Sequence, residues 1–243
     1  MSVFASLLRT AYRVSGAKKA FALPEDKIVP VIEKQNRHRG VFVPTDRKAY
    51  YETIDVSGFP CLIVREKPQP AKRAILYFFG GGNVSTCGFS SGGALALGIA
   101  AHNNALGAPL PPPRHIVAVS PGEVPWNDAE KARMQALNDK DVSIDYAFMT
   151  LVEKFMRHGQ ENVPDYMISG SRGDFSGVGD IHFFYSADEV LYGALPDFET
   201  ACQRAHVPHT AFARPGMVHC YCMLPYFKEA KEDFGKITAI LRK

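Results

Sequence analysis

A serine with a glycine two residues before it and another two residues after it is the strongest chemical motif in this 243-residue chain. Gly88-Phe89-Ser90-Ser91-Gly92-Gly93 fits the pattern G-x-S-x-G. The motif lies between a predicted strand, 85–89, and a predicted helix, 91–101, which is the context in which such a serine acts as a nucleophile. A sharp strand-to-helix turn exposes the Ser90 Oγ. The backbone N–H of Ser91, at the helix start, is then a candidate donor to an oxyanion.

A serine nucleophile needs a general base, and His219 is the best placed of the eight histidines. It lies in the loop between the last predicted strand, 209–213, and the last predicted helix, 226–241. His206 and His209 instead lie at a helix end and at a strand start.

The base needs a carboxylate to orient it, and two adjacent candidates follow the predicted strand 181–185. They lie where that strand ends, and active groups of open α/β sheets collect at the carboxyl edge. Asp188 is the preferred residue and Glu189 is the alternative.

Three consecutive glycines could supply a second oxyanion donor. Gly80, Gly81 and Gly82 follow the continuous apolar run 74–79, which is typical of a strand buried on both faces. Glycine lets backbone N–H groups approach a reacting oxygen closely. A flexible turn without catalytic meaning is the alternative interpretation.

Strands must alternate with helices to position these residues. The β-rich segments 50–56 and 61–65 predict a hairpin, and apolar runs at 74–79, 116–119 and 181–185 predict buried strands. Helical patterns separate the later strands. This order predicts an α/β fold, in which helices flank a mainly parallel sheet, within a single domain that spans residues 1–243.

The composition excludes several classes of function. The net charge of +3 is too small and too dispersed for a nucleic-acid-binding surface. No run of 18 apolar residues predicts a membrane span. The five cysteines contain no C-x-x-C pair, so we expect neither a disulfide framework nor a zinc site built from them. A reducing, cytoplasmic location fits this cysteine usage.

Four segments together resemble the hormone-sensitive-lipase-like branch of the α/β-hydrolases, which contains bacterial carboxylesterases and acetyl esterases. Residues 79–82 resemble its HGGG motif and residues 88–93 its GDSAGG motif. Residues 186–191 resemble the segment that bears the catalytic aspartate, and residues 216–219 resemble the histidine loop. The chain order serine, aspartate, histidine is also that of the family.

The resemblance runs from about residue 50 to the end and implies an α/β-hydrolase fold with a helical cap at about 1–45 and 127–170. It implies a catalytic triad of Ser90, Asp188 and His219. It also implies three backbone N–H donors to the oxyanion, those of Gly81, Gly82 and Ser91. An acyl-enzyme would form on Ser90 and be released by water, without a metal or cofactor. The small residues around the serine favour short-chain acyl esters as substrates.

The sequence departs from the family pattern in three places. Phe79 replaces the motif histidine and Phe89 replaces the aspartate. Only residues 80–84 separate the strand 74–79 from the nucleophile strand, whereas a parallel crossover takes about a dozen residues or more. The family places a helix, a strand and a second helix here, roughly 40–70 residues by ordinary element lengths.

We therefore expect that this chain cannot form the standard sheet by this route. A segment is omitted from the sequence, or an internal deletion has shortened the sheet, or a second chain completes it as in domain swapping. Omission or deletion is favoured. A deletion beside Gly81 and Gly82 threatens the oxyanion hole, and loss of one donor typically costs ~10²–10³ in turnover.

A serine carboxylesterase is the leading hypothesis, with a small-molecule ester as its partner. The alternative is a catalytically weak or inactive relative that binds a small molecule or a partner. A cysteine hydrolase that uses Cys87 or Cys220 ranks third, because neither cysteine occupies the turn after the strand. The predicted sheet edge at 210–213 allows a homodimer, since sheet edges pair readily.

Overall fold

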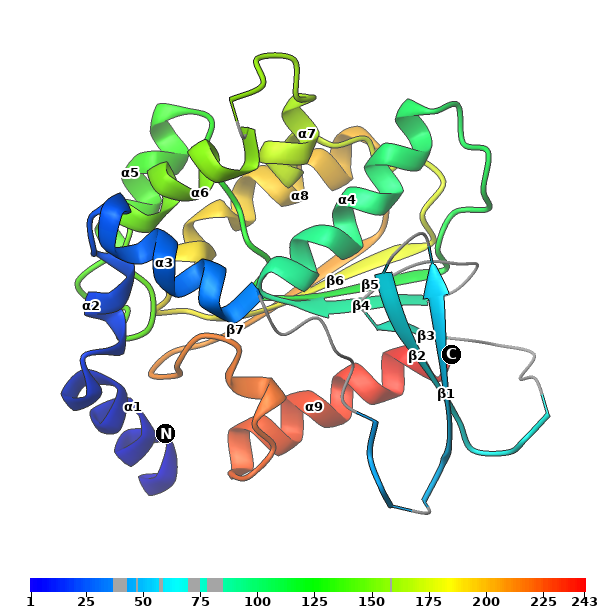
Figure 1. The fold of residues 1–243 in the computed structure, drawn as a ribbon, viewed down its shortest axis with the longest axis horizontal. Helices are drawn as coiled ribbons and strands as arrows, with labels where there is room; N and C mark the ends of the chain where they lie inside the picture. Colours follow the sequence, from blue (N-terminus) through cyan, green and yellow to red (C-terminus); the bar gives the residue numbers. More distant parts are fainter. Residues whose placement is uncertain (37–42, 47, 57–58, 70–74, 78–84, 158) are drawn as a thin grey trace.

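A five-stranded parallel sheet is the framework of the protein in this computed structural model (Figure 1). The structure describes residues 1–243 except 37–42, 47, 57–58, 70–74, 78–84 and 158. The strand order is β3-β4-β5-β6-β7, and every neighbouring pair is parallel. The strands are β3 (Ile75–Tyr77), β4 (Ser85–Phe89), β5 (His115–Val119), β6 (Asp180–Ser186) and β7 (His209–Arg214). The parallel α/β architecture expected from the alternating elements is confirmed, and β7 is an edge strand as expected.

Nine α-helices occur in the described part of the chain. They are α1 (Val3–Ser15), α2 (Ala17–Phe21), α3 (Glu25–Asn36), α4 (Ser91–Ala105), α5 (Asp128–Leu137), α6 (Ala147–Arg157), α7 (Asp165–Ile168), α8 (Leu195–Arg204) and α9 (Lys228–Leu241). Three short 3₁₀ helices join them: η1 (Gly170–Arg172), η2 (Val190–Ala194) and η3 (Tyr221–Met223). No helix in this described part is long and apolar enough to cross a membrane.

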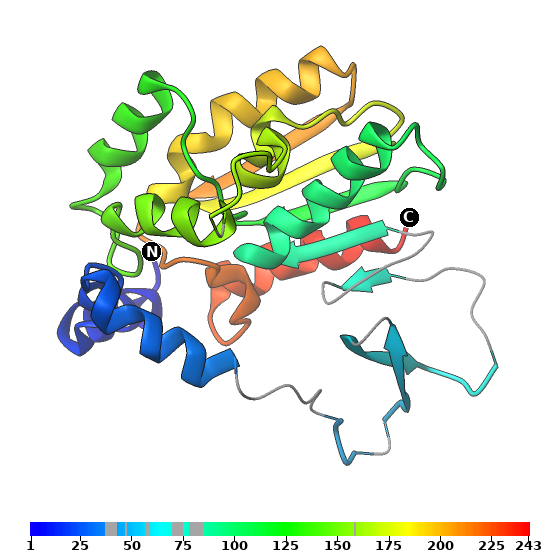
Figure 2. The ribbon, with the colours of Figure 1, turned by 45° about the horizontal axis from the view of Figure 1, so that its top comes forward.

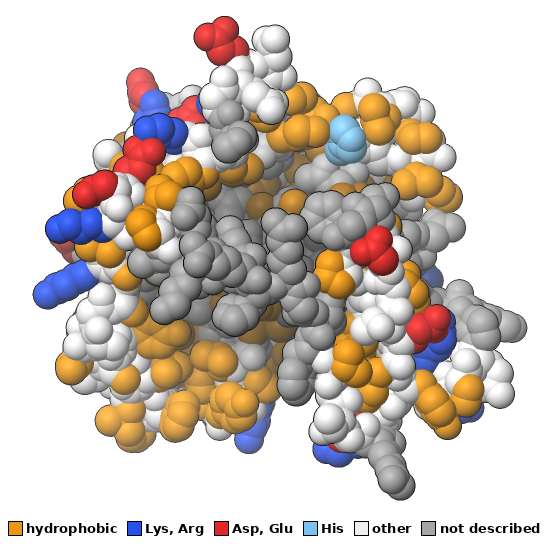
Figure 3. Space-filling model, in the orientation of Figure 1, with side chains coloured by type: hydrophobic (Ala, Val, Ile, Leu, Met, Phe, Trp, Pro, Cys, Tyr) orange, Lys and Arg blue, Asp and Glu red, His pale blue; other side chains and the backbone are white. Residues whose placement is uncertain are grey.

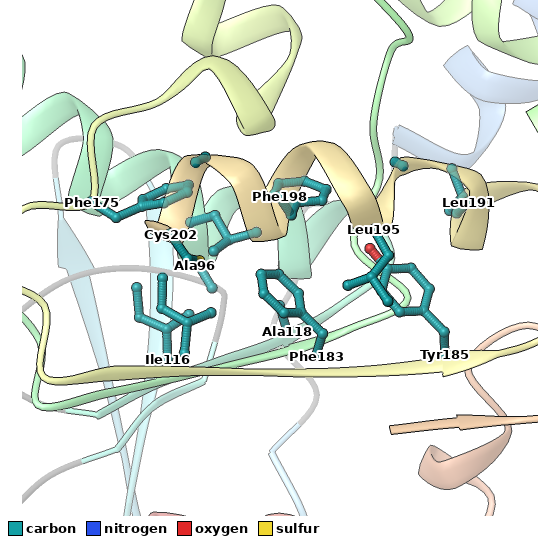
Figure 4. Close-up of a cluster of buried hydrophobic side chains, with 14 of the residues drawn as sticks. Ala96, Ile116, Ala118, Phe175, Phe183, Tyr185, Leu191, Leu195, Phe198 and Cys202 are labelled. Atoms are coloured by element: carbon teal, nitrogen blue, oxygen red, sulfur yellow. The ribbon is translucent and has the colours of Figure 1, made fainter. Parts of the chain in front are cut away.

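Helices cover both faces of the sheet (Figures 1 and 2). On one face, Ile116 of β5 and Phe183 of β6 pack with Phe198 of α8 and with residues of α4 (Figure 4). On the other face, Val117 packs into a second cluster with Ile237 of α9. Because every residue of β5 is buried, its continuous apolar sequence is explained by burial on both faces.

The predicted hairpin forms a separate two-stranded sheet. Strands β1 (Tyr50–Val56) and β2 (Phe59–Arg65) pair antiparallel, with Tyr50 opposite Arg65 and Val56 opposite Phe59. Figure 2 shows this hairpin set apart from the main sheet. It therefore adds no strand to the five-stranded sheet that carries the candidate site.

The strands on either side of the short connection are parallel neighbours in the sheet. Ile75 pairs with Ser85 and Tyr77 with Cys87. From the five residues 80–84 we expected that the chain cannot form the standard sheet by this route. The connection itself, 78–84, lies outside the described residues, so an omitted segment, an internal deletion or a second chain stays a prediction.

The N-terminal helices pack on the segment that contains α5 and α6. The Lys18 ammonium donates to the backbone oxygens of Asn138 and Asp141. Phe21 packs edge-to-face on Phe148, with ring centroids 4.9 Å apart. These contacts join the two regions, 1–45 and 127–170, that the resemblance assigns to a cap.

Apolar side chains remain exposed on the outer side of α1. Figure 3 shows them at the lower left of the molecule, where α1 lies. The exposed apolar residues of this helix are Val3, Phe4, Leu7 and Val14. The opposite side of α1 turns Ala5 and Arg9 toward the body of the protein.

Candidate active site

Ser90 occupies the strained turn that the motif predicts between β4 and α4. Its backbone has φ 53° and ψ −126°, a conformation that is unfavourable for a residue with a side chain. A Cβ at position 88 would lie 2.1 Å from the backbone oxygen of Gly92, so only glycine fits there. The Ser90 N–H donates to the Val119 carbonyl at 2.8 Å, which fixes the turn against β5.

The surroundings of Ser90 leave its hydroxyl available for chemistry. Ser90 is the N-cap residue of α4, but its side chain makes no capping hydrogen bond. Ser91 is the first residue of α4, so its N–H belongs to the helix-end donors without an acceptor inside the helix. The other two expected oxyanion donors, Gly81 and Gly82, lie outside the described residues.

His219 is held by a buried carboxylate, and that carboxylate is Glu189. Its Oε2 lies 2.5 Å from His219 Nδ1. The other oxygen, Oε1, accepts hydrogen bonds from the Ser120 hydroxyl at 2.7 Å and the Ser186 N–H at 2.8 Å. Since Glu189 is only 1% exposed, these donors hold both carboxylate oxygens in place.

Asp188, the preferred residue in the sequence interpretation, has different partners. Its Oδ2 lies 2.8 Å from Arg9 Nη1 of α1 and accepts a 3.0 Å hydrogen bond from the Gly216 N–H. The structure therefore does not pair Asp188 with His219, and Glu189 is the carboxylate in contact with the imidazole. The physical reason is the turn after β6, which points these adjacent side chains in different directions.

The second ring nitrogen of His219 faces a thiol. His219 Nε2 lies 3.2 Å from Cys220 Sγ, and this sulfur lies 3.9 Å from the Val119 carbonyl oxygen that also accepts from Ser90 N–H. Both Ser90 and His219 therefore reach the carboxyl end of β5. Within the described part of the chain, no hydrogen bond joins Ser90 Oγ to His219.

The charge state of His219 follows from these neighbours. Burial by itself lowers the pKa of the imidazole, but the Cys220 sulfur and the Glu189 carboxylate favour the protonated ring and together raise the pKa well above its ordinary value. Cys87, one of the two alternative cysteine nucleophiles, is poorly suited to attack, because burial raises the pKa of its thiol to about 12. A thiol with this pKa holds almost no thiolate at neutral pH.

Several supporting residues were not predicted from the sequence. Asp141 accepts hydrogen bonds from the N–H groups of Val190, Ser143 and Ile144, at 2.8, 2.7 and 3.1 Å. Ser143 Oγ in turn accepts from the His219 N–H at 3.3 Å. A single buried carboxylate thus links the residue after Glu189 to the loop that carries the base. No local motif marks these residues, because the contacts join segments far apart in the chain.

Arg9 is the most widely connected of these unpredicted residues. Besides Asp188, its guanidinium donates to the carbonyl oxygens of Met217 at 3.2 Å and Lys140 at 2.6 Å. One side chain of α1 therefore contacts the acid turn, the base loop and the segment after α5. Arg9 belongs to no sequence motif, and all three of its partners lie far away in the chain, so these contacts could not be predicted from the sequence.

A surface groove of about 280 Å³ lies elsewhere, between α2–α3 and α6. Its lining residues are Phe21, Leu23, Glu25, Ala147, Thr150, Leu151 and Lys154. Ser90, Glu189 and His219 do not line it, so this groove is separate from the candidate catalytic residues.

The comparisons with known proteins agree with this architecture. Residues 73–223, more than half of the chain, match a family model described as alpha/beta hydrolase fold. This match includes Ser90, Glu189 and His219, and it confirms the expected fold class. Among curated proteins, none matches this sequence.

Solved structures of esterases share the fold across the whole chain. An esterase/lipase from an uncultured bacterium is 16% identical with a TM-score of 0.74, and the alignment covers 100% of this chain and 98% of that chain. The esterase EstE5, in a crystal soaked with ethyl alcohol, is 17% identical with a TM-score of 0.76 and the same two coverages. An esterase from the bacterial hormone-sensitive lipase family is 16% identical with a TM-score of 0.72, again over 100% and 98%. At these identities the likeness establishes the fold.

Proposed function

Because the chain belongs to the α/β-hydrolase fold family, we propose that it is a serine carboxylesterase that hydrolyses short-chain acyl esters. The observation that carries this proposal is the meeting of three features at one sheet edge. Ser90 lies in a strained strand-to-helix turn, His219 lies in the loop after β7, and Glu189 holds the imidazole. Relatives of the same fold are esterases and lipases, which supports an ester as the substrate.

The proposed reaction begins with attack of Ser90 Oγ on the ester carbonyl carbon. His219 Nε2 accepts the hydroxyl proton, and Glu189 stabilises the imidazolium that forms. The oxyanion of the tetrahedral intermediate accepts a hydrogen bond from the Ser91 N–H, and the expected partners of this donor are Gly81 and Gly82. Collapse of the intermediate passes the proton from His219 to the departing alcohol and leaves an acyl-enzyme on Ser90.

Deacylation repeats the same proton transfers with water. His219 removes a proton from a water molecule, which attacks the acyl carbon, and the proton then returns to Ser90 Oγ as the acid leaves. For both half-reactions Nε2 must turn from Cys220 Sγ, 3.2 Å away, toward the reacting oxygen. The proposed mechanism therefore includes a rotation of the ring before the first attack.

The preference for short acyl groups belongs to the same proposal. Small residues surround Ser90, and the described helices α1–α3 and α5–α6 contact one another beside the carboxyl edge of the sheet. We assign them to a cap that limits the acyl site. One structure of EstE5 was obtained after soaking with p-nitrophenyl butyrate, which makes this ester a suitable probe.

Further parts of the proposal concern location and assembly. The buried cysteines Cys87, Cys202, Cys220 and Cys222 form no disulfides, which fits a cytoplasmic protein. The edge strand β7 is the element through which two copies could pair as a homodimer.

A weak or inactive relative is the second candidate, and one observation favours it. His219 Nε2 faces Cys220 Sγ instead of Ser90 Oγ, so the base is not aligned with the nucleophile. If this arrangement persists when an ester binds, the protein binds the ester without forming an acyl-enzyme.

Hydrolysis of p-nitrophenyl acetate and butyrate separates the two candidates. We expect turnover by the parent, loss of turnover in Ser90→Ala, and unchanged turnover in Ser176→Ala, which removes an exposed hydroxyl. A fluorophosphonate reagent should label the peptide that contains Ser90. Equal background rates in the parent and Ser90→Ala, with no label on Ser90, would contradict the esterase proposal and favour the binding protein.

A further inference from the structure

A second group of ionisable side chains lies at the edge of the sheet opposite Ser90. His115 is the first residue of β5, while Asp180 and His182 are the first and third residues of β6. The parallel register pairs His115 with Asp180, and alternate residues of a strand face the same side of a sheet. One donor atom from each of the three residues lies within 4.8 Å of the other two.

A single carboxylate oxygen joins the two imidazoles. Asp180 Oδ1 lies 2.7 Å from His115 Nδ1 and 2.9 Å from His182 Nε2. Two imidazole nitrogens and one carboxylate oxygen form a donor set that suits Zn²⁺ and neighbouring divalent transition metals. Three such donors leave a fourth position for water.

The two rings are held in ways that suit a metal ligand. His182 Nδ1 lies 2.7 Å from Thr210 Oγ1, so the outer nitrogen has the partner that metal-binding imidazoles commonly have. His115 is buried, and its Nε2 has no hydrogen-bond partner in the described part of the chain. Asp180 is therefore the one hydrogen-bond partner of this ring among the described residues, and it directs Nδ1 toward the shared carboxylate oxygen.

The space required by an ion is close to what the cluster offers. Tetrahedral Zn²⁺ with bonds near 2.0–2.2 Å places its donors about 3.4 Å apart. The contacts of Asp180, 2.7 Å to His115 and 2.9 Å to His182, need to lengthen by about 0.5–0.7 Å to reach that spacing. The Asp180 side chain is 30% exposed, so water reaches the site and can complete the coordination.

We propose that His115, Asp180 and His182 bind one divalent transition-metal ion, with Zn²⁺ as the best match to the donor set. The ion ties the start of β5 to the start of β6. The positive charge of Lys243 acts on His182 and repels a bound cation. The affinity for the metal ion therefore depends on the three donor atoms and not on the charge of the surroundings. The site serves stability and takes no part in ester hydrolysis.

The proposed metal site lies far from the proposed active site. Ser90 and His219 lie beyond the carboxyl ends of the strands, and β6 has seven residues. At about 3.3 Å per residue, roughly 20 Å separates the two edges. Loss of the ion is therefore expected to change thermal stability while leaving esterase turnover at room temperature unchanged.

Metal titration of the full chain tests the proposal. Protein without a polyhistidine tag is treated with a chelator, desalted and titrated with Zn²⁺ by calorimetry at pH 7.5. We expect one Zn²⁺ per chain, and a rise in Tm of about 5–10 °C at a hundredfold excess over Kd. Added Co²⁺ should give the visible absorption of a four- or five-coordinate ion.

Variants identify the ligands. Asp180→Asn removes the anionic donor with little change in shape and should weaken Zn²⁺ binding more than about 100-fold, beyond what loss of an outer partner costs. Thr210→Val removes only that outer partner and should weaken binding about 10-fold. His206→Gln, which changes an exposed histidine outside the cluster, should bind as the parent does.

Three results would overturn the metal site. The first is that the parent binds no Zn²⁺. The second is that Asp180→Asn binds Zn²⁺ as tightly as the parent. The third is that His206→Gln loses as much Zn²⁺ affinity as Asp180→Asn does. Each would leave the cluster as a hydrogen-bonded group without an ion. If Asp180→Asn does not fold, judged by circular dichroism, His182→Asn replaces it. Because esterase turnover is measured separately on the same samples, failure of the metal site leaves the proposed activity tested on its own.

Discussion

Glu189 Oε2 lies 2.5 Å from His219 Nδ1, so Glu189 is the carboxylate that contacts this imidazole. Glu189 is buried and receives two further hydrogen bonds, from Ser120 and Ser186. Its neighbour Asp188 is paired with Arg9 instead. The esterase proposal therefore gives the two adjacent acids separate tasks: Glu189 orients the base, and Asp188 anchors the loop that carries it.

Replacement of each acid should separate these tasks. Glu189→Gln keeps the shape but removes the charge that stabilises the imidazolium, so kcat/KM for p-nitrophenyl butyrate should fall by about 10³–10⁴-fold. Asp188→Asn should lose less than about tenfold, because the Glu189 contact remains. Steady-state kinetics on the two purified variants make the comparison. A larger loss in Asp188→Asn would return the orienting role to Asp188.

The pH profile should report the raised pKa of His219. The base must be neutral to accept a proton, so kcat/KM should rise with pH and level off only above the raised pKa of His219, which exceeds its ordinary value of about 6.5. Removal of the Glu189 charge destabilises the imidazolium and lowers that pKa. NMR titration of the His219 ring in Ser90→Ala, compared with Ser90→Ala/Glu189→Gln, measures the shift directly. A midpoint at or below the ordinary value in Ser90→Ala would contradict this assignment.

Arg9 should act as a positioning residue for the base. Its guanidinium contacts Asp188, the Met217 carbonyl and the Lys140 carbonyl, so Arg9→Ala frees the loop before His219. Since small misplacements of a catalytic group are costly, kcat should fall by about 10–100-fold with little change in KM. Arg9→Lys should recover only part of the loss, because an ammonium lacks the planar fork of donors.

The control for Arg9 lies on the same helix. Arg13→Ala removes an exposed cation of α1 and should leave both kcat and KM unchanged. Urea unfolding of all three variants separates positioning from general destabilisation. If Arg9→Ala loses stability in proportion to its activity, or behaves as Arg13→Ala does, the positioning role is wrong.

Cys220 should compete with Ser90 for the base. Its Sγ lies 3.2 Å from His219 Nε2 and raises the pKa of the ring. Cys220→Ala removes both effects, so kcat/KM should be retained or increased up to about tenfold below neutral pH, where more of the base becomes neutral. Kinetics between pH 5.5 and about 8 check this. Loss of turnover in Cys220→Ala combined with turnover in Ser90→Ala would identify Cys220 as the nucleophile instead.

Local patterns in the sequence were sufficient for a large part of the fold. The apolar runs 116–119 and 181–185 predicted buried strands, which are β5 and β6, and the alternation of strands and helices predicted the parallel sheet. The turn at Ser90 was also predictable. It depends on Gly88, because a Cβ there would meet the backbone of Gly92, four residues later in the chain.

Strand β3 shows what a local pattern left open. The apolar run 74–79 was expected to form a strand buried on both faces, but among the described residues β3 spans only Ile75–Tyr77, and Ile75 is 51% exposed. Strand length and burial depend on which neighbours provide hydrogen-bond partners and cover each face, so neither could be read from the apolar run.

The sequence by itself predicted the strand-to-helix turn at Ser90 and the parallel α/β architecture, because short-range sterics and periodic burial act between residues close in the chain. Only the tertiary structure decided the partners of the charged side chains. Glu189 contacts His219, Arg9 forms an ion pair with Asp188, and His115 contacts Asp180. These contacts join distant segments. The direction of each side chain there is set by strand register and by the packing of α1 on the sheet edge, and neither is encoded in the local spacing of residues.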